Sequence, residues 1–225
     1  MDAFESLSPE MSTSILDIGA ACGGLGLALL ERFGCKNYLG LEIHEGAAAI
    51  GNEAVSTFGR GVLSGDILDG EQIFESLGLP QEYDLVVSLS ALDWNEDVRE
   101  NVQAAWRHVA EGGKLLMSLR LHPTICLLDL ESSYQSTSPE ILDGDEIAPY
   151  VIMSIPAAIE FAKSLGVARA TVFGYWGQPS ATAVTTLDRC IFAVAVLEKD
   201  SRFSAHNMFA IDWPTSLELE ALGCL

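Results

Sequence analysis

The residues from Ser14 to Leu30 constrain the fold of this chain more than any other stretch. They begin with a short apolar run, Ile15–Ile18, which has the composition of a buried strand in a parallel sheet. A turn rich in glycine and alanine follows, and leucines at helical spacing then extend to Leu30. A strand, a glycine-rich turn and a helix in this order place backbone N–H groups and a helix N-terminus beside the end of the strand. We therefore expect a ligand at this turn.

One acidic residue in this stretch narrows the choice of ligand. Asp17 precedes Gly19 by two residues, so that the turn reads Asp-x-Gly-x-Ala-x-Gly. A carboxylate repels the phosphates of a dinucleotide, whereas it favours a cofactor that carries an ammonium group. The spacing from Gly19 to Gly24 also fits a variant of the nicotinamide fingerprint, so the turn alone leaves both classes of cofactor open.

The turn resembles the first motif of the class I S-adenosylmethionine-dependent methyltransferases, Asp/Glu-x-Gly-x-Gly-x-Gly, with Ala21 in place of the middle glycine. Later stretches are similar to the family's other motifs and follow the family's order. They are an acid at the end of the expected strand 38–43, a Gly-Asp pair at 65–66, a Tyr-Asp start to the strand 83–90, and a Gly-Gly turn at 112–113 that follows a helix expected over 96–109.

This resemblance implies an α/β fold with a doubly wound, mostly parallel, seven-stranded Rossmann-like sheet. The implied strand order is 3-2-1-4-5-7-6, the last-numbered strand is antiparallel, and helices cover both faces. We expect a single methyltransferase domain over residues 1–225. It divides into a cofactor-binding half (14–120), a substrate-covering insert (121–152), a closing helix and strand pair (153–200) and a tail (201–225). The alternative for the insert is a mobile surface loop.

The resemblance also implies roles for individual residues. Glu42 would accept hydrogen bonds from both ribose hydroxyls, although an acid at a helix N-terminus is the alternative. Asp66 would bind the adenine amino group, although a Gly-Asp pair also suits a plain turn. The cofactor-binding residues expected on this basis are Asp17, Gly19, Ala20, Ala21, Gly23, Glu42, Ile43, Gly65, Asp66, Ile67, Ser88 and Leu89.

Residues after the fourth and fifth strands are candidates for contact with the methyl acceptor. His122 is the first candidate for a general base and Asp93 the second, with a turn residue and a helix cap as their alternatives. Aromatic side chains are expected to line an apolar substrate site, although aromatic residues more often pack in a core. These candidates are Trp94, Tyr134, Tyr175 and Trp176, and Tyr150 joins them.

Charge and cysteine spacing exclude several other classes of function. Lys and Arg number 12 against 32 Asp and Glu, and the resulting net charge of −20 argues against a nucleic-acid substrate or an anionic membrane surface. The five cysteines show no metal-ligand spacing, and their odd number fits reduced thiols in a cytoplasm. We expect a cytoplasmic protein without a metal, and we leave its oligomeric state open.

The sequence thus predicts an enzyme that moves a methyl group from S-adenosylmethionine to an O, N or C atom of a small molecule. The Asn/Asp-Pro-Pro-aromatic motif of amino methyltransferases is absent after the fourth strand, where Ser88-Leu-Ser-Ala91 stands. Two alternatives remain: an NAD(P)-dependent Rossmann oxidoreductase, and a non-catalytic cofactor-binding module that needs a partner.

Overall fold

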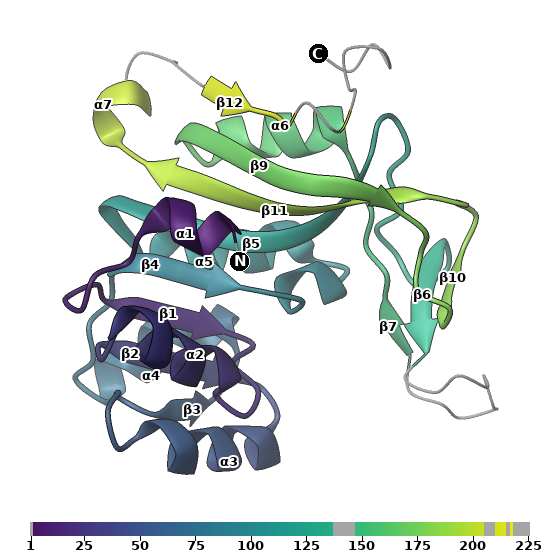
Figure 1. The fold of residues 1–225 in the computed structure, drawn as a ribbon. Coiled ribbons are helices and arrows are strands. Elements are labelled where there is room, and N and C mark those ends of the chain that lie inside the picture. Colours follow the sequence, from purple (N-terminus) through teal and green to yellow (C-terminus); the bar gives the residue numbers. More distant parts are fainter. Residues whose placement is uncertain (1, 137–146, 205–209, 215–216, 218–225) are drawn as a thin grey trace.

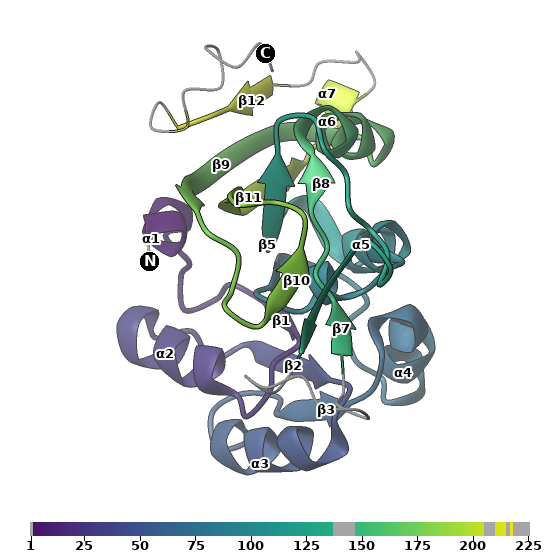
Figure 2. The same cartoon turned by 90° about the vertical axis from the view of Figure 1, so that its right-hand side faces the viewer.

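The computed structural model describes residues 2–136, 147–204, 210–214 and 217. Its main feature is a sheet whose strands follow the order β12-β9-β11-β5-β4-β1-β2-β3, with β8 (Met153–Ser154) paired to β5 beside this path (Figures 1 and 2). The strands of the path are β1 (Ile15–Ile18), β2 (Tyr38–Glu42), β3 (Val62–Ser64), β4 (Tyr83–Ser88), β5 (Val109–His122), β9 (Val167–Gly177), β11 (Cys190–Lys199) and β12 (Ala210–Asp212).

The strand order of the main sheet confirms the predicted topology. Strands β1 to β5 pair in parallel in the order 3-2-1-4-5, and β11 runs antiparallel to both β5 and β9. Since β9 and β11 take the sixth and seventh places, the order is 3-2-1-4-5-7-6 with an antiparallel last strand. Strand β12 pairs in parallel with β9 and adds an outer strand that the sequence did not indicate.

Helices cover both faces of the sheet, as expected (Figure 1). One apolar cluster joins the sheet to α1, α2 and α3 through Phe4, Leu29 and Val55. The other joins it to α4 and α5 through Phe74 and Val102, and to α6. The helices are α1 (Asp2–Leu7), α2 (Gly24–Phe33), α3 (Glu45–Val55), α4 (Gly70–Ser76), α5 (Val98–Arg107), α6 (Ile155–Ser164) and α7 (Ser201–Ser204), with 3-10 turns at Ile67–Asp69 and Leu92–Trp94.

The boundary between α5 and β5 differs from the expectation. The helix ends at Arg107, and β5 begins at Val109, before the predicted glycine turn. Val109 already pairs with Tyr83 of β4, and the register then shifts before Leu85 pairs with Lys114. The Gly-Gly turn therefore forms an irregularity inside the strand, where Gly112 adopts a φ of +79°.

The insert after β5 contributes to a second, smaller sheet. Its strands follow the order β10-β6-β7, and it projects beyond one end of the main sheet (Figure 1). Strands β6 (Ser133–Ser136) and β7 (Ile147–Pro149) belong to the insert, whereas β10 (Ala183–Thr185) comes from the connection between β9 and β11. The insert thus contributes two strands, whereas residues 123–132 before β6 form turns and irregular structure with one isolated bridge, from Leu127 to Ile152. Residues 137–146, and most of the tail after 204, lie outside the described part of the chain.

Candidate cofactor and acceptor site

The turn after β1 has the backbone geometry that its small residues suggested. Gly19 adopts a φ of +76°, and a Cβ built there would lie 2.3 Å from the Cβ of Ala91, so only glycine fits without movement. Ala21 adopts a φ of +46°, a conformation that L-residues other than glycine seldom adopt. Its N–H donates to Oε2 of Glu42 at 2.9 Å, which links the turn to the end of β2.

Asp17 lies beneath this turn and not in a cavity. Its carboxylate is buried and accepts a hydrogen bond from the hydroxyl of Tyr38 at 2.6 Å. Burial raises the pKa of Asp17 from 3.8 to about 6; the Tyr38 hydrogen bond opposes this rise, and the charge of Glu42 adds to it. An acid held in this way is costly for the fold, which makes it a candidate for a functional role.

A cavity of about 340 Å³ opens at the carboxyl ends of the first three strands. Its walls include seven residues expected to bind the cofactor, namely Gly19, Ala21, Glu42, Ile43, Gly65, Asp66 and Ile67. Glu42 is fixed in place, because its second oxygen accepts from the N–H of His44 at 2.9 Å. The carboxylate of Asp66 accepts from the N–H of Leu68 and caps the 3-10 turn Ile67–Asp69. The Gly-Asp pair therefore also has the turn role that was the alternative to adenine binding.

The far wall of this cavity differs from the prediction. Ser88 and Leu89 do not line it, and the hydroxyl of Ser88 is buried and accepts from the N–H of Leu92. The residues that follow β4 take their place, together with two asparagines, and the sequence analysis missed all of them. They are Ser90, Ala91, Leu92, Asn95 and Asn101. A polar Asn101 on the apolar face of α5 was the one signal available in the sequence.

A second, open cavity of about 640 Å³ adjoins the first, and Ser90 lines both. Its aromatic residues are Trp94, Tyr150, Phe173, Tyr175 and Phe192, so Trp94, Tyr150 and Tyr175 lie where the sequence placed them.

Two aromatic residues expected to line the substrate site do not line this cavity. Trp176 follows Tyr175 in β9, so its side chain lies on the opposite face of the sheet. There its indole N–H donates to the carbonyl of Leu217 at 3.1 Å. Tyr134 precedes Gln135 in β6, so the two side chains lie on opposite faces of the small sheet, and Gln135 is the one that lines the cavity.

Asp93 belongs to a buried ion pair in the wall of the open cavity. Its Oδ2 lies 3.0 Å from Nη2 of Arg120, and the two side chains are 7% and 5% exposed. Burial raises the pKa of Asp93, while the charge of Arg120 and a hydrogen bond from Ser118 oppose the rise. The helix-cap alternative for Asp93 is wrong, because α5 begins at Val98 after Asp97. Arg120, which the sequence analysis also missed, is a charged residue inside an apolar run.

His122 lines none of the three cavities. Its Nδ1 accepts hydrogen bonds from the N–H groups of Thr124 and Ile125, at 3.2 and 2.9 Å. These contacts occupy the nitrogen that would take a proton from a substrate. They are the contacts of a turn residue, which was the alternative interpretation of His122. The structure brings Asp93 to the site and leaves His122 outside it.

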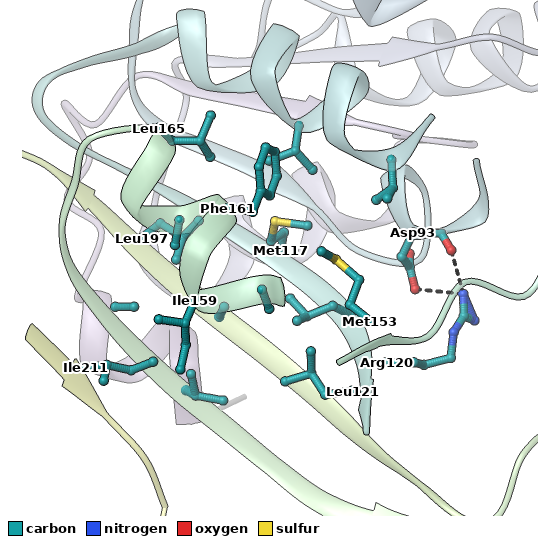
Figure 3. Close-up of a pocket in the computed structure, with 18 of the residues that line it drawn as sticks. Asp93, Met117, Arg120, Leu121, Met153, Ile159, Phe161, Leu165, Leu197 and Ile211 are labelled. Atoms are coloured by element: carbon teal, nitrogen blue, oxygen red, sulfur yellow. Dashed lines mark hydrogen bonds and ion pairs between the residues drawn. The ribbon is translucent and has the colours of Figure 1, made fainter. Parts of the chain in front are cut away.

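A third cavity of about 70 Å³ lies between the sheet and α6 and is almost entirely apolar (Figure 3). Asp93 and Arg120 stand at one end of it, and with Leu119 they line the open cavity as well. Among the described residues, no group of three His, Cys, Asp or Glu side chains is placed to hold a metal ion. No helix in that part of the chain is long and apolar enough to cross a membrane.

Comparison with known proteins agrees with this geometry. A family model described as "Methyltransferase domain" matches residues 16–115. The N-terminal domain of EvdMO1, solved with S-adenosylhomocysteine bound, shares 19% identity and a TM-score of 0.58, over 88% of this chain and 79% of that one. Residues 16–115 are thus similar to the methyltransferase family, and the fold of the chain is the Rossmann-like fold of class I S-adenosylmethionine-dependent methyltransferases. No curated protein sequence matches it.

Two further solved structures show how widely this methyltransferase fold is used. An S-adenosylmethionine-dependent methyltransferase from Mesorhizobium loti shares 19% identity and a TM-score of 0.57, over 88% of this chain and 96% of that one. The [4+2]-cyclase SpnF shares 12% identity and a TM-score of 0.54, over 88% and 81%. At these identities the likeness concerns the fold, and the reaction must be argued from the site. The family match ends at residue 115, before most residues of the open cavity.

Proposed function

We propose that this protein is a methyltransferase that binds S-adenosylmethionine in the 340 Å³ cavity and methylates an O, N or C atom of a small molecule held in the 640 Å³ cavity. One observation carries this proposal: the two cavities adjoin at Ser90, just past the end of β4. Adjoining sites are what a group transfer between two bound molecules needs, because the reacting atoms must approach to about 3–3.5 Å.

The residues of the smaller cavity fit the parts of the cofactor. Glu42 stands with a fixed carboxylate at the strand end that faces a ribose in this fold. Ile43 is 70% exposed at the cavity wall, which leaves an apolar face for the adenine ring to cover. Asp66 offers its second oxygen to the adenine amino group. We propose that Asp17, Ala20 and Gly23 act through the shape of the turn, and that Ser88 and Leu89 support the methionine end.

When bound, S-adenosylmethionine would supply a methyl group on a sulfonium for in-line displacement by the acceptor's lone pair, with the electron pair of the carbon–sulfur bond left on sulfur. The chain's own residues align the acceptor and exclude water, which can supply most of the rate. Gln135 and Tyr150 reach the open cavity from the insert and from its junction with β8, so we assign the small sheet the role of substrate cover. We assign the general-base role to Asp93 in preference to His122.

The exposed thiols of Cys22 and Cys126 are free, which suits a reducing compartment, and we propose a cytoplasmic location.

Calorimetric titration with S-adenosylmethionine and with NAD tests the cofactor assignment. We expect Glu42→Ala to weaken S-adenosylmethionine binding by about 1–3 kcal/mol, as the loss of hydrogen bonds to a carboxylate predicts. Glu45→Ala is the matched control, because Glu45 is an exposed acid of α3 that lines none of the three cavities described above. Binding of NAD without S-adenosylmethionine would refute the assignment. Release of S-adenosylhomocysteine with a panel of acceptors then tests the transfer.

A further inference from the structure

The open cavity contains a single cation that no role described above uses. Among the described residues, Arg120 is the one lysine or arginine that lines any of the three cavities. Its Nε donates to the carbonyl of Val151 at 3.1 Å, and its Nη2 donates to the carbonyl of Asp93 at 2.7 Å. Its Nη1 donates to none of the described residues. This nitrogen is also not one of the fully buried polar atoms that lack a hydrogen-bond partner, so it is accessible from the cavity. Figure 3 shows this nitrogen on the side away from the apolar cavity.

The guanidinium is held rigidly in this orientation. Besides the two carbonyls and the carboxylate of Asp93, two aromatic rings pack against it: its carbon lies 4.0 Å from the centre of the Tyr150 ring and 4.9 Å from that of Trp94. A group fixed by so many contacts does not reorganise when a ligand arrives, so the N–H groups of Nη1, which no described residue accepts from, form a prepared site for an oxygen atom. An oxygen that gains negative charge during a reaction benefits most from such a site.

The remaining walls of the cavity favour a flat, apolar molecule. Tyr175 and Phe192 stack with ring centres 5.7 Å apart and planes at 23°. Tyr175 is nevertheless 65% exposed, so one face of this stack is open. An aromatic ring placed here gains both apolar burial and ring contacts. The cavity therefore combines a planar apolar surface with one fixed hydrogen-bond donor of positive charge.

We propose that the acceptor is a planar aromatic compound with an ionisable hydroxyl group, and that Nη1 of Arg120 binds this oxygen as it loses its proton. The proposal rests on the proposed function and narrows its acceptor atom to oxygen. The O–H bond breaks, the proton passes to the carboxylate of Asp93, and the electron pair stays on the oxygen, ready to take the methyl group. Arg120 then exchanges one anionic partner for another and is never left buried without one.

The surroundings of the ion pair are consistent with this exchange. Ser118 connects the pair to the junction of the two cavities, since its hydroxyl accepts from the N–H of Ser90 at 2.7 Å and lies 3.5 Å from Oδ1 of Asp93. The other titratable groups beside the pair are Tyr150 and Cys190. Burial raises the pKa of both, so they stay neutral.

The test uses 4-nitrophenol as a chromogenic probe with the protein saturated by S-adenosylhomocysteine. We expect the bound probe to ionise at a pH at least one unit lower than the free probe, which is a tenfold change in the ratio of phenolate to phenol. We expect 4-nitroanisole, which lacks the hydroxyl, to bind at least tenfold more weakly. Arg120→Gln should abolish both differences. Arg189→Gln should preserve them, because Arg189 makes a similar contact, 4.0 Å from the ring centre of Trp176, but lines none of the three cavities described above.

Arg120→Gln leaves Asp93 buried without its partner and is the variant at risk of misfolding. The double variant Asp93→Asn/Arg120→Gln removes both charges and should also lose the shift in the ionisation of the probe. The proposal is overturned if wild-type protein binds no 4-nitrophenol at millimolar concentration, or if any folded variant without Arg120 retains the shift. Calorimetry with S-adenosylhomocysteine alone separates this failure from a failure of the proposed function, because cofactor binding does not depend on the probe.

Discussion

Replacing Asp17 by asparagine should stabilise the protein. The carboxylate is buried and its pKa is raised from 3.8 to about 6. A raised pKa means that the folded state binds the proton more tightly than the unfolded state does, so this group's contribution to stability falls as the pH rises from about 4 to about 6. A shift of this size corresponds to about 3 kcal/mol at pH 7.5, which is the upper limit of the gain. Asparagine keeps an oxygen for the hydroxyl of Tyr38, so the hydrogen bond is retained.

Urea unfolding at pH 7.5 and at pH 5 measures this effect. We expect Asp17→Asn to raise the free energy of unfolding at pH 7.5 by about 1–3 kcal/mol and to raise it less at pH 5. Asp69→Asn is the control, because it changes the net charge of the protein by the same amount but removes an exposed carboxylate and not a buried one. A destabilised Asp17→Asn protein, or an effect that does not change with pH, would refute the reasoning from burial.

Three other substitutions test separate parts of the structure. Ala21→Gly should raise the free energy of unfolding by roughly 1 kcal/mol in urea, because it relieves a left-handed backbone conformation; a loss of stability would contradict the φ of +46°. Asp93→Asn should lower the free energy of unfolding by about 3–5 kcal/mol, because Arg120 is left buried without its carboxylate. The double variant Asp93→Asn/Arg120→Gln should recover part of this loss. Ala170→Val should fill part of the apolar 70 Å³ cavity and raise the free energy of unfolding by at most about 1.7 kcal/mol, the value of the whole cavity at about 24 cal/mol per Å³. A lower thermal midpoint for Ala170→Val would show that the space is not free.

The parts of the site that follow from local sequence were predictable. The turn at Gly19 and the acid at Glu42 each follow from neighbouring residues, since the glycine permits the turn and the strand end positions the acid. The order of the strands came from the resemblance to a family, because pairing between distant strands leaves no local signal.

The residues that were missed depend on tertiary contacts. Arg120 stands inside an apolar strand, and its partner Asp93 comes from another loop, 27 positions earlier. The small sheet was missed because its strands have only three or four residues each and come from two distant segments. Tyr134 and Trp176 were assigned to the substrate site because the face that each residue of a strand presents depends on a register the sequence did not fix.

The most direct test of the account is a crystal structure of the protein with S-adenosylhomocysteine bound. We predict that the nucleoside occupies the 340 Å³ cavity with its ribose hydroxyls on the carboxylate of Glu42, and that its sulfur lies beside Ser90, facing the open cavity. A nucleoside bound elsewhere, or a sulfur atom closed off from the open cavity, would contradict the claim that the two cavities bring the cofactor and the acceptor together.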